Sequence, residues 1–316
     1  MSKKIIFDDQ PGLPFEEWGN PYSEPADAAA NEQAAPPRPL YYCSFGSGSS
    51  GNSCYVGSRE GGLIVDVGIR AEDIERGLAA NGVDMKHVKG VLLTHDHADH
   101  VKYVYSLLRS HRHLKLFCTN RVLNGMLRKH SISRRIKEYH VPVFKEIPFK
   151  VMDFEITAFD VPHDGSDNMG FSIEFDGRRF VIATDLGEVT ERARYYMGRA
   201  TYLMIESNYD AYMLRTGRYP EYLKARIAGG SGHLDNVQTA AFLSEIVNPG
   251  LTHVFLCHLS KDNNTPAIAL RTVREALESK GLKVGNALET LEDRRADIQL
   301  AALPRFDMTR WFVLRK

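Results

Sequence analysis

Residues Thr94 to His100 read Thr-His-Asp-His-Ala-Asp-His, follow the apolar run Val91–Leu93 and precede a helical pattern that begins at Ala98. Imidazole nitrogens and carboxylate oxygens are common ligands of divalent metals. A pattern this dense in histidine seldom arises by chance, so a solvated polar turn is the weaker interpretation. A tight turn can direct His95 and His97 at one metal while Asp99 and His100, at the helix start, face a second. The segment therefore predicts a metal centre, and it can supply ligands for two ions.

Further ligand types stand at the ends of three later apolar runs. His163 follows residues 159–162, Asp185 follows 181–184 and His258 follows 254–257. One such residue alone is more often an ordinary turn residue. Three at matching positions, downstream of the histidine-rich segment, indicate that strand ends complete the metal centre.

Short apolar runs alternate with helical patterns from Leu40 onward, and they fall into two sets of strands. The first set comprises 40–45, 53–56, 63–67, 88–94 and 114–119; the second comprises 151–161, 170–175, 179–184, 202–206 and 253–258. Helical periodicity marks 71–81, 98–110, 121–129, 236–247 and 266–280. Asp176-Gly177 predicts a two-residue hairpin, and 298–303 and 311–314 are expected to add edge strands. This order favours an α/β (α+β) fold, a four-layer αββα sandwich, over a doubly wound sheet.

The first 39 residues differ in composition from the rest. They hold seven of the 14 prolines, and seven acidic side chains against three basic ones give them a charge of −4. Because the whole chain has a formal charge of zero, residues 40–316 carry +4. We expect residues 1–39 to form an extended, poorly ordered leader and 40–316 to form one domain. A leader that docks on the body or on a partner is the alternative.

The overall composition is that of a globular protein. Of 316 residues, 40 are Lys or Arg, 40 are Asp or Glu and 43% are hydrophobic, which excludes fibrous and mostly disordered classes. No apolar stretch is long enough to span a membrane, and Met1 to Gln10 lack a signal-peptide pattern. We expect a cytoplasmic protein whose four cysteines are reduced and buried. A net charge of zero also argues against binding nucleic acid by bulk electrostatics.

Taken together, the HxHxDH segment, the later His163, the Ala183-Thr184-Asp185 string and His258 resemble the metallo-β-lactamase-fold hydrolases. The resemblance covers most of residues 40–280. It implies two divalent metal ions (zinc, manganese or iron), with His95, His97 and His163 on the first. Asp99, His100 and His258 would hold the second, Asp185 would bridge both, and Asp66 would support the histidine turn from behind the ligands. Asp99 then counts among the catalytic residues as well as the ligands.

Four local strings narrow the resemblance to the WalJ/YycJ (VicX) branch: residues 47–53, 206–208, 232–236 and 258–264. That branch is associated with DNA exonuclease activity from 5′ ends, so the implied partner is a DNA end. Two features depart from the branch: the acidic leader, and Asp235 in Gly232-His233-Leu234-Asp235-Asn236, where serine is expected. Neither departure touches a predicted ligand.

The Ser/Gly run from Ser47 to Ser53 offers hydrogen-bond donors that could bind a phosphate. Hydroxyls and free backbone N–H groups bind anions, so Ser47, Ser49, Ser50 and Asn52 are candidate phosphate contacts; a flexible turn between strands is the plainer alternative. No lysine follows in P-loop spacing, which argues against a nucleotide cofactor. The basic stretch 128–135 is either a solvated helix face or part of a protein groove that contacts DNA phosphates.

Phosphodiester hydrolysis needs a proton for the departing oxygen. An imidazole held by a carboxylate supplies one near neutral pH, and we predict His233 as the acid with Glu206, at the end of an apolar run, as its partner. The alternative is that His233 caps the helix that follows it. The remaining histidines, among them His130, receive no role.

Three functions compete. The leading hypothesis is a dinuclear phosphodiesterase in which a hydroxide between the metals attacks phosphorus. A thioester or other small-molecule ester hydrolase of the same fold needs no phosphate cradle and no proton donor opposite a sugar oxygen. A non-catalytic regulatory or binding protein is disfavoured because all seven expected ligands are present.

Overall fold

The computed structural model describes residues 37–289, 293 and 295–315. Most of the predicted leader, residues 1–39, therefore lies outside the described residues. A compact body begins at Pro37. Arg38 belongs to this body, because its backbone N–H donates to Asp176 Oδ2 at 2.9 Å and its guanidinium lies 3.1 Å from Asp153 Oδ2.

Strands of the body form two sheets. The first has the order β15 (Phe312–Leu314), β1 (Leu40–Gly46), β2 (Ser53–Gly57), β3 (Gly62–Val65), β4 (Val88–Leu92), β5 (Lys115–Cys118), β6 (His140–Pro142). The second has the order β13 (Val284–Asn286), β14 (Ile298–Ala302), β12 (His253–Cys257), β11 (Tyr202–Glu206), β10 (Arg178–Ala183), β9 (Met169–Phe175), β8 (Phe154–Asp160), β7 (Phe149–Val151).

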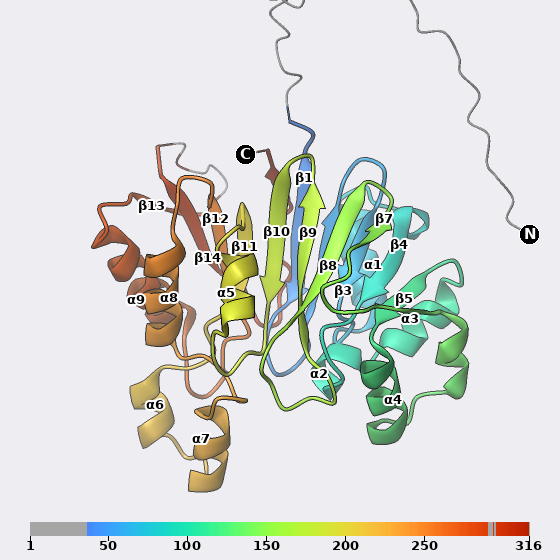
Figure 1. Ribbon diagram of the computed structural model, residues 1–316, viewed down its shortest axis with the longest axis horizontal. Helices are drawn as coiled ribbons and strands as arrows, with labels where there is room; N and C mark the ends of the chain where they lie inside the picture. The colour runs from blue at the N-terminus through green and yellow to red at the C-terminus, as the bar shows by residue number, and fades with distance from the viewer. Residues whose placement is uncertain (1–36, 290–292, 294, 316) are drawn as a thin grey trace, which may run out of the picture. The chain divides into compact units, whose positions relative to one another are not determined.

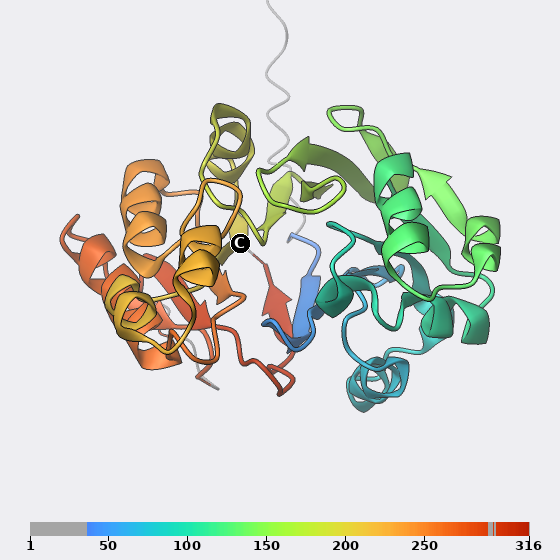
Figure 2. The same ribbon diagram turned by 90° about the horizontal axis from the view of Figure 1, so that it is seen from below.

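Helices cover the outer face of each sheet. Figures 1 and 2 show α8 (Asn236–Ile246) and α9 (Pro266–Glu278) on one flank, with α5 (Glu191–Met197) nearby, and α1 (Ala71–Ala80), α3 (Val104–Ser110) and α4 (Asn120–Lys129) on the other. The body is thus the αββα sandwich that the sequence predicts. Among the described residues, no helix has the length and apolarity needed to cross a membrane.

The central strands of the second sheet, β10, β11 and β12, are buried on both faces. Along β10, Phe180 and Ile182 join the core between the sheets, whereas Val181 and Ala183 join the core under α5, α8 and α9. Because successive side chains of a strand point to opposite faces, such a strand appears in the sequence as a continuous apolar run. Between the sheets, the ring of Tyr42 lies 4.6 Å from that of Phe255.

Parallel pairing brings the ends of several strands to one edge. β3 pairs in parallel with β4, and β10, β11 and β12 pair in parallel with one another. The residues that follow these strands therefore meet at the same edge of the sandwich. In Figure 1 this is the lower edge, where α2 (Ala98–Val101), α6 (Ala211–Thr216) and α7 (Glu221–Ile227) also lie.

Most predicted elements are present, and three predictions were wrong in detail. The helix predicted over 98–110 is broken into α2 and α3 because the N–H of Tyr103 donates to Val67 O at 3.0 Å and leaves the helical pattern. The strand predicted over 151–161 is the hairpin β7–β8, which turns at Met152 with φ of 55°. The segment 298–303 is not an edge strand, since β14 lies between β12 and β13.

Two other local predictions are confirmed. Asp176 and Gly177 both have positive φ, 52° and 74°, and connect the antiparallel strands β9 and β10. These are the dihedrals that a two-residue hairpin turn requires. Cys43, Cys54, Cys118 and Cys257 are buried and free, and burial raises the pKa of the Cys43 thiol to about 11.

Candidate active site and metal centre

The histidine-rich loop joins β4 to α2, and Asp96 holds it in place. The Asp96 carboxylate is buried, accepts the N–H of Ser166 at 2.9 Å and lies 3.1 Å from Lys129 Nζ. His130 Nε2 lies 2.7 Å from Asp96 O. Lys129 and His130 therefore fix the loop, a role that the sequence analysis did not assign them.

Asp66 stands behind the loop at the end of β3. Its carboxylate accepts the N–H of Thr94 at 2.9 Å and the Thr94 hydroxyl at 2.8 Å, and it lies 2.7 Å from His100 Nδ1. A carboxylate on one imidazole nitrogen fixes the ring and leaves the other nitrogen for a metal. This is the position that the resemblance implied for Asp66.

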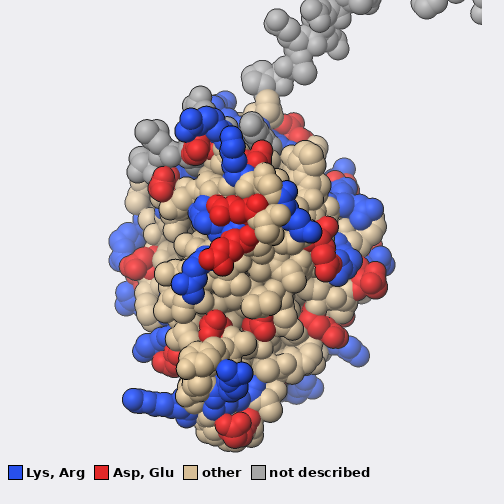
Figure 3. Space-filling view, turned by 90° about the vertical axis from the view of Figure 1, so that its left-hand side faces the viewer, with Lys and Arg blue, Asp and Glu red and all other residues tan. Residues whose placement is uncertain are grey.

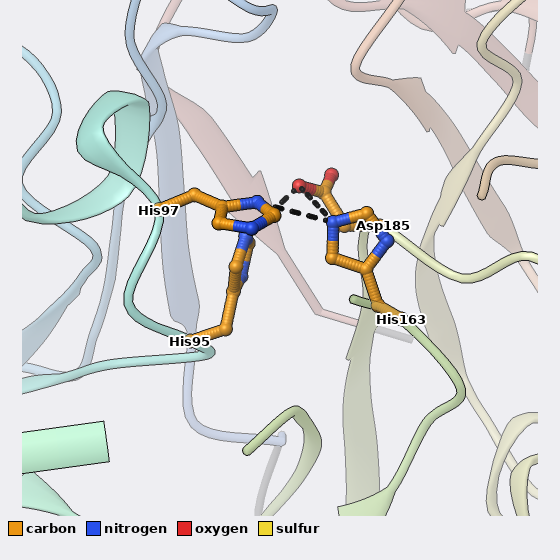
Figure 4. Close-up of side chains that lie close together, drawn as sticks. All are labelled: His95, His97, His163 and Asp185. Atoms are coloured by element: carbon orange, nitrogen blue, oxygen red, sulfur yellow. Dashed lines mark hydrogen bonds and ion pairs between the residues drawn. The ribbon is translucent and has the colours of Figure 1, made fainter. Parts of the chain in front are cut away.

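The first ligand group consists of His95, His97, His163 and Asp185. Each of these four residues offers one atom, and those atoms lie within 4.8 Å of one another. Figure 4 shows the side chains converging from opposite sides, with His95 and His97 on one strand-end loop and His163 and Asp185 on two others. Nδ1 of His163 lies 2.9 Å from Gly232 O, so Nε2 faces the group.

The second ligand group consists of Asp99, His100 and His258, again within 4.8 Å. Asp185 reaches both groups. Its Oδ2 lies 3.2 Å from His95 Nε2 and 3.1 Å from His100 Nε2, while its Oδ1 lies 2.8 Å from His258 Nδ1. The seven predicted ligands are thus brought together, with Asp185 between the two groups.

Donor chemistry at this centre fits divalent cations. His95 Nε2 is buried and has no hydrogen-bond partner among the described residues, although it points at Asp185. A buried polar atom without a partner is costly, and a metal ion would satisfy it. Two neighbouring groups of nitrogen and oxygen donors around one carboxylate are a suitable donor set for two such ions.

Backbone conformation at three of these strand ends is unusual. Asp66, Asp185 and His258 have φ of 59°, 52° and 53°, a region that residues other than glycine seldom adopt. Strain of this kind persists where the surrounding structure enforces it, and it clusters at functional sites. Here it turns Asp185 and His258 toward the ligand groups, and Asp66 toward His100, within two residues of the end of each strand.

Electrostatics act differently on different ligands. Burial opposes protonation of His100 and His258, but the Asp185 carboxylate beside them outweighs it and raises the pKa of both rings, so a metal ion has to displace their protons. Burial, together with neighbouring His95 and His163, lowers the pKa of His97 to about 4, so this imidazole is neutral near pH 7. Burial opposes ionisation of Asp185, but His258 and His100 outweigh it and hold the pKa of its carboxyl well below the usual range. Metal ligands must be deprotonated, and His97 and Asp185 meet that condition.

Glu206 and His233 form a pair beside the centre. Glu206 is fully buried, and its Oε1 lies 2.7 Å from His233 Nδ1 and 2.9 Å from His258 Nδ1. Its Oε2 accepts the N–H of Leu186 at 3.0 Å. Burial alone would lower the pKa of His233, but the Glu206 carboxylate outweighs burial and raises it.

His233 does not cap the helix that follows. The N-cap of α8 is Asp235, whose side chain accepts from Gln238 N while the Gln238 side chain accepts from the Asp235 N–H. Aspartate and serine are both good N-caps. Asp235, at the position where serine was expected, therefore caps the helix itself.

A buried amide network joins three of the four strings that carried the resemblance. The Ser207 hydroxyl donates to Asn236 Oδ1 at 2.6 Å, and Asn236 Nδ2 donates to Asn264 Oδ1 at 3.0 Å. Asn264 Nδ2 donates to the carbonyl of Asn208 at 3.0 Å. The network locks the ends of β11 and β12 against α8, which sets Glu206, His233 and His258 relative to one another.

The Ser/Gly loop divides into inward and outward residues. Ser47 is buried and its Oγ accepts the N–H of His258 at 2.9 Å; Asn52 is buried and its Nδ2 lies 3.2 Å from Asp99 Oδ2. These two polar side chains position predicted ligands. Ser49 and Ser50 are exposed, and Ser49 lines the pocket.

Sequence reasoning missed two residues at the pocket. Asp164 Oδ1 lies 3.2 Å from His97 Nε2, and its Oδ2 lies 2.7 Å from Nη2 of Arg226 on α7. The position of Asp164 directly after a predicted ligand was a usable signal. Arg226 carried no signal in the sequence, because the contact depends on how α7 folds back.

Both groups open into one pocket of about 170 Å³. Its lining includes His97, Asp99, His163, Asp185, His233 and His258, together with Ser49, Asp164 and Arg226. Five of the seven predicted ligands and the predicted acid thus face the same small space, and His95 and His100 are not part of its lining.

Comparison with known proteins identifies the family of this chain. Residues 67–259 match the family model described as the beta-lactamase superfamily domain. The chain is 33% identical over 256 residues to exodeoxyribonuclease YycJ of Bacillus anthracis, covering 79% of this chain and 94% of that one. The chain belongs to the metallo-β-lactamase-fold superfamily, in the group of YycJ and WalJ.

Within this family, exodeoxyribonuclease WalJ of Streptococcus pneumoniae is 30% identical over 245 residues, covering 77% of this chain and 90% of the relative. Among solved structures, the metallo-β-lactamase-fold protein YhfI from Bacillus subtilis superposes with a TM-score of 0.60 at 14% identity, covering 88% of this chain and all of that one. The family and the fold that the sequence indicated are confirmed.

Proposed function

We propose that this protein is a two-metal phosphodiesterase that removes nucleotides from the 5′ ends of DNA. The observation that carries the proposal is the Glu206–His233 pair, 2.7 Å apart, in the same pocket as the two ligand groups. The relatives named exodeoxyribonucleases support DNA as the substrate.

In this proposal His95, His97 and His163 hold one divalent cation, and Asp99, His100 and His258 hold the other. Asp185 is shared, since its two oxygens face the two groups. Zinc, manganese and iron all suit these donors. When bound, the two cations would lower the pKa of the attacking water and offset negative charge that develops on phosphorus.

His233 gives its proton to the departing sugar oxygen. The Glu206 carboxylate engages Nδ1 and favours the protonated ring, which leaves Nε2 to donate. A positioned acid of this kind contributes about 10²- to 10⁴-fold. Glu206 also contacts His258, so the acid keeps its place relative to the second ligand group.

The Ser/Gly loop holds the 5′-terminal phosphate in this proposal. Ser49 lines the pocket and supplies a hydroxyl, and the exposed Ser50 follows it. Ser47 and Asn52 do not contact the phosphate in this proposal. Their side chains hydrogen-bond to His258 and Asp99 and so position these two ligands.

The test supplies manganese or zinc to purified protein and compares three substrates: 5′-phosphorylated linear duplex DNA, closed circular DNA and a thioester. We expect only the linear duplex to be consumed, with a 5′ label released before a 3′ label. Efficient thioester cleavage with inert linear DNA would contradict the proposal and favour a thioester hydrolase of the same fold.

A further inference from the structure

Residues 210–232 form an arm between Glu206 and His233, and it contains the short helices α6 and α7. Both roots of the arm are fixed at the site: Tyr209 and Asp235 form a β-bridge, and the N–H of Asp210 donates to Asn263 O at 2.8 Å. Near its end, the N–H of His233 donates to Ile227 O at 2.8 Å. The arm is therefore tied to the pocket even though its helices project from the sheet edge (Figure 1).

Little apolar packing holds the arm. Leu214 is the buried residue of α6, and none of the α7 residues is buried. The contacts that hold it are polar: Lys224 Nζ donates to Arg215 O at 2.8 Å, and the Tyr219 hydroxyl donates to Asp262 Oδ2 at 2.8 Å. Because the arm contributes so few side chains to the core, most of its side chains are free to contact a ligand.

Two tyrosines on the arm point into solvent. Tyr212 is 64% exposed and Tyr222 is 76% exposed. The guanidinium of Arg215 lies 5.5 Å from the centroid of the Tyr212 ring. Aromatic rings beside arginines are the surface on which single-stranded nucleic acids stack their bases.

Charge on the arm has the sign that nucleic acid requires. Residues 210–232 contain four basic side chains (Arg215, Arg218, Lys224 and Arg226) against two acidic ones (Asp210 and Glu221). The lower end of Figure 3, where α6 and α7 lie, shows Lys and Arg side chains beside acidic ones and uncharged surface. The formal charge of the whole chain is zero, so this excess is local.

Arg226 connects the exposed aromatic surface to the pocket. It lines the pocket, and its side chain is 61% exposed beyond its contact with Asp164. Tyr222 lies four residues before Arg226 on α7, so the two side chains share one face of the helix. That spacing is about 6 Å along the helix axis, which lets a strand place a phosphate at Arg226 and a neighbouring base at Tyr222.

We propose that the arm binds the DNA strand next to the linkage being cut: Tyr212 and Tyr222 stack bases, and Arg226 contacts a backbone phosphate at the pocket mouth. This inference rests on the proposed function and extends it. The occupant is single-stranded DNA, since stacking on exposed tyrosines needs bases that are not paired. A duplex end would be frayed as it enters.

The test measures binding of a fluorescent, 5′-phosphorylated single-stranded oligonucleotide with nuclease-resistant phosphorothioate linkages, by anisotropy. Tyr212→Ala combined with Tyr222→Ala should weaken binding at least tenfold, because stacking contributes about 1–3 kcal/mol per base, about 5- to 150-fold. The matching Phe substitutions keep the rings and should bind like the wild type. In a plot of the logarithm of the binding constant against the logarithm of the salt concentration, Arg226→Ala should make the negative slope shallower by about 0.7, the value expected for the loss of one phosphate contact.

Tyr195 on α5 provides the control. It is 46% exposed, and Arg199 lies over its ring at 3.7 Å, but it lies on α5 and outside the arm. Tyr195→Ala should leave DNA binding unchanged. If the wild type degrades DNA, unchanged affinity in the double Ala variant, or equal losses in the Ala and Phe variants, would overturn the proposed role of the arm but not the proposed function. A wild type that neither binds nor degrades DNA would overturn the proposed function and the arm together.

Discussion

Nδ1 of His233 lies 2.7 Å from Oε1 of Glu206, and the same carboxylate oxygen lies 2.9 Å from Nδ1 of His258. One buried carboxylate thus contacts both the proposed acid and a proposed metal ligand. Glu206 ends β11, His258 follows β12, and these strands pair in parallel. The register of these strands therefore sets the distance between Glu206, which holds the proposed acid, and the proposed ligand His258.

His233→Ala should lower kcat on DNA by about 10²- to 10⁴-fold, as expected when a general acid is lost. Metal content should stay at the wild-type level, because His233 is not among the seven predicted ligands. Turnover of 5′-labelled DNA and elemental analysis of the same preparation check both statements. His87→Ala, at an exposed histidine outside this pocket, is the matched control and should change neither.

Glu206→Gln should move the alkaline limb of the pH–rate profile to lower pH. Glu206 raises the pKa of His233, and an acid is active only while protonated, so activity falls as pH rises through that pKa. Without the carboxylate charge the pKa of His233 drops, and the fall begins at lower pH. A profile of kcat from pH 6 to 10 whose alkaline limb stays in place would show that Glu206 does not set the protonation of His233.

Asp185→Ala should remove both metals, because its two oxygens face the two ligand groups. We expect two metal ions per wild-type chain after reconstitution and dialysis, and less than one in the variant. Asp160→Ala, which alters an exposed aspartate paired with Lys145, is the control and should keep both. Two ions per chain in the Asp185 variant would refute the shared-ligand assignment.

Asp235 should tolerate serine but not alanine. Its side chain accepts from Gln238 N at 2.7 Å as the N-cap of α8. Asp235→Ala should lower the free energy of unfolding by about 1 kcal/mol, whereas Asp235→Ser retains an oxygen acceptor and should cost a few tenths. Urea denaturation of the three proteins measures this. Equal losses in both variants would mean that Asp235 acts through its charge.

Residues that signal their role by type and spacing were predictable. The HxHxDH loop, the three strand-end ligands and Glu206 stand where apolar runs stop. Parallel pairing of β10, β11 and β12 brings Asp185, Glu206 and His258 to one edge of their sheet, whereas His163 follows β8, which pairs antiparallel with both of its neighbours. Burial on both faces of β10 likewise explains why a continuous apolar run marked a strand. Local pattern and tertiary structure agree at these positions.

Features that depend on distant backbone contacts were not predictable. The helix break at Tyr103 arises from its hydrogen bond to Val67. Helices α6 and α7 bury almost nothing, so they lack the apolar periodicity that marks a helix in sequence. The contact of Asp164 with Arg226 exists because α7 places Arg226 at the lining of the pocket.

The division of work between the metal centre and His233 is the central claim, and a sulfur-bridged substrate tests it most directly. An oligonucleotide with sulfur in place of the departing sugar oxygen has a leaving group that needs no proton. Single-turnover rates of wild type and His233→Ala are compared on this substrate and on the ordinary one. We predict that the loss of about 10²- to 10⁴-fold on the oxygen substrate nearly vanishes on the sulfur substrate. An equal loss on both would contradict the assignment of His233 as the acid.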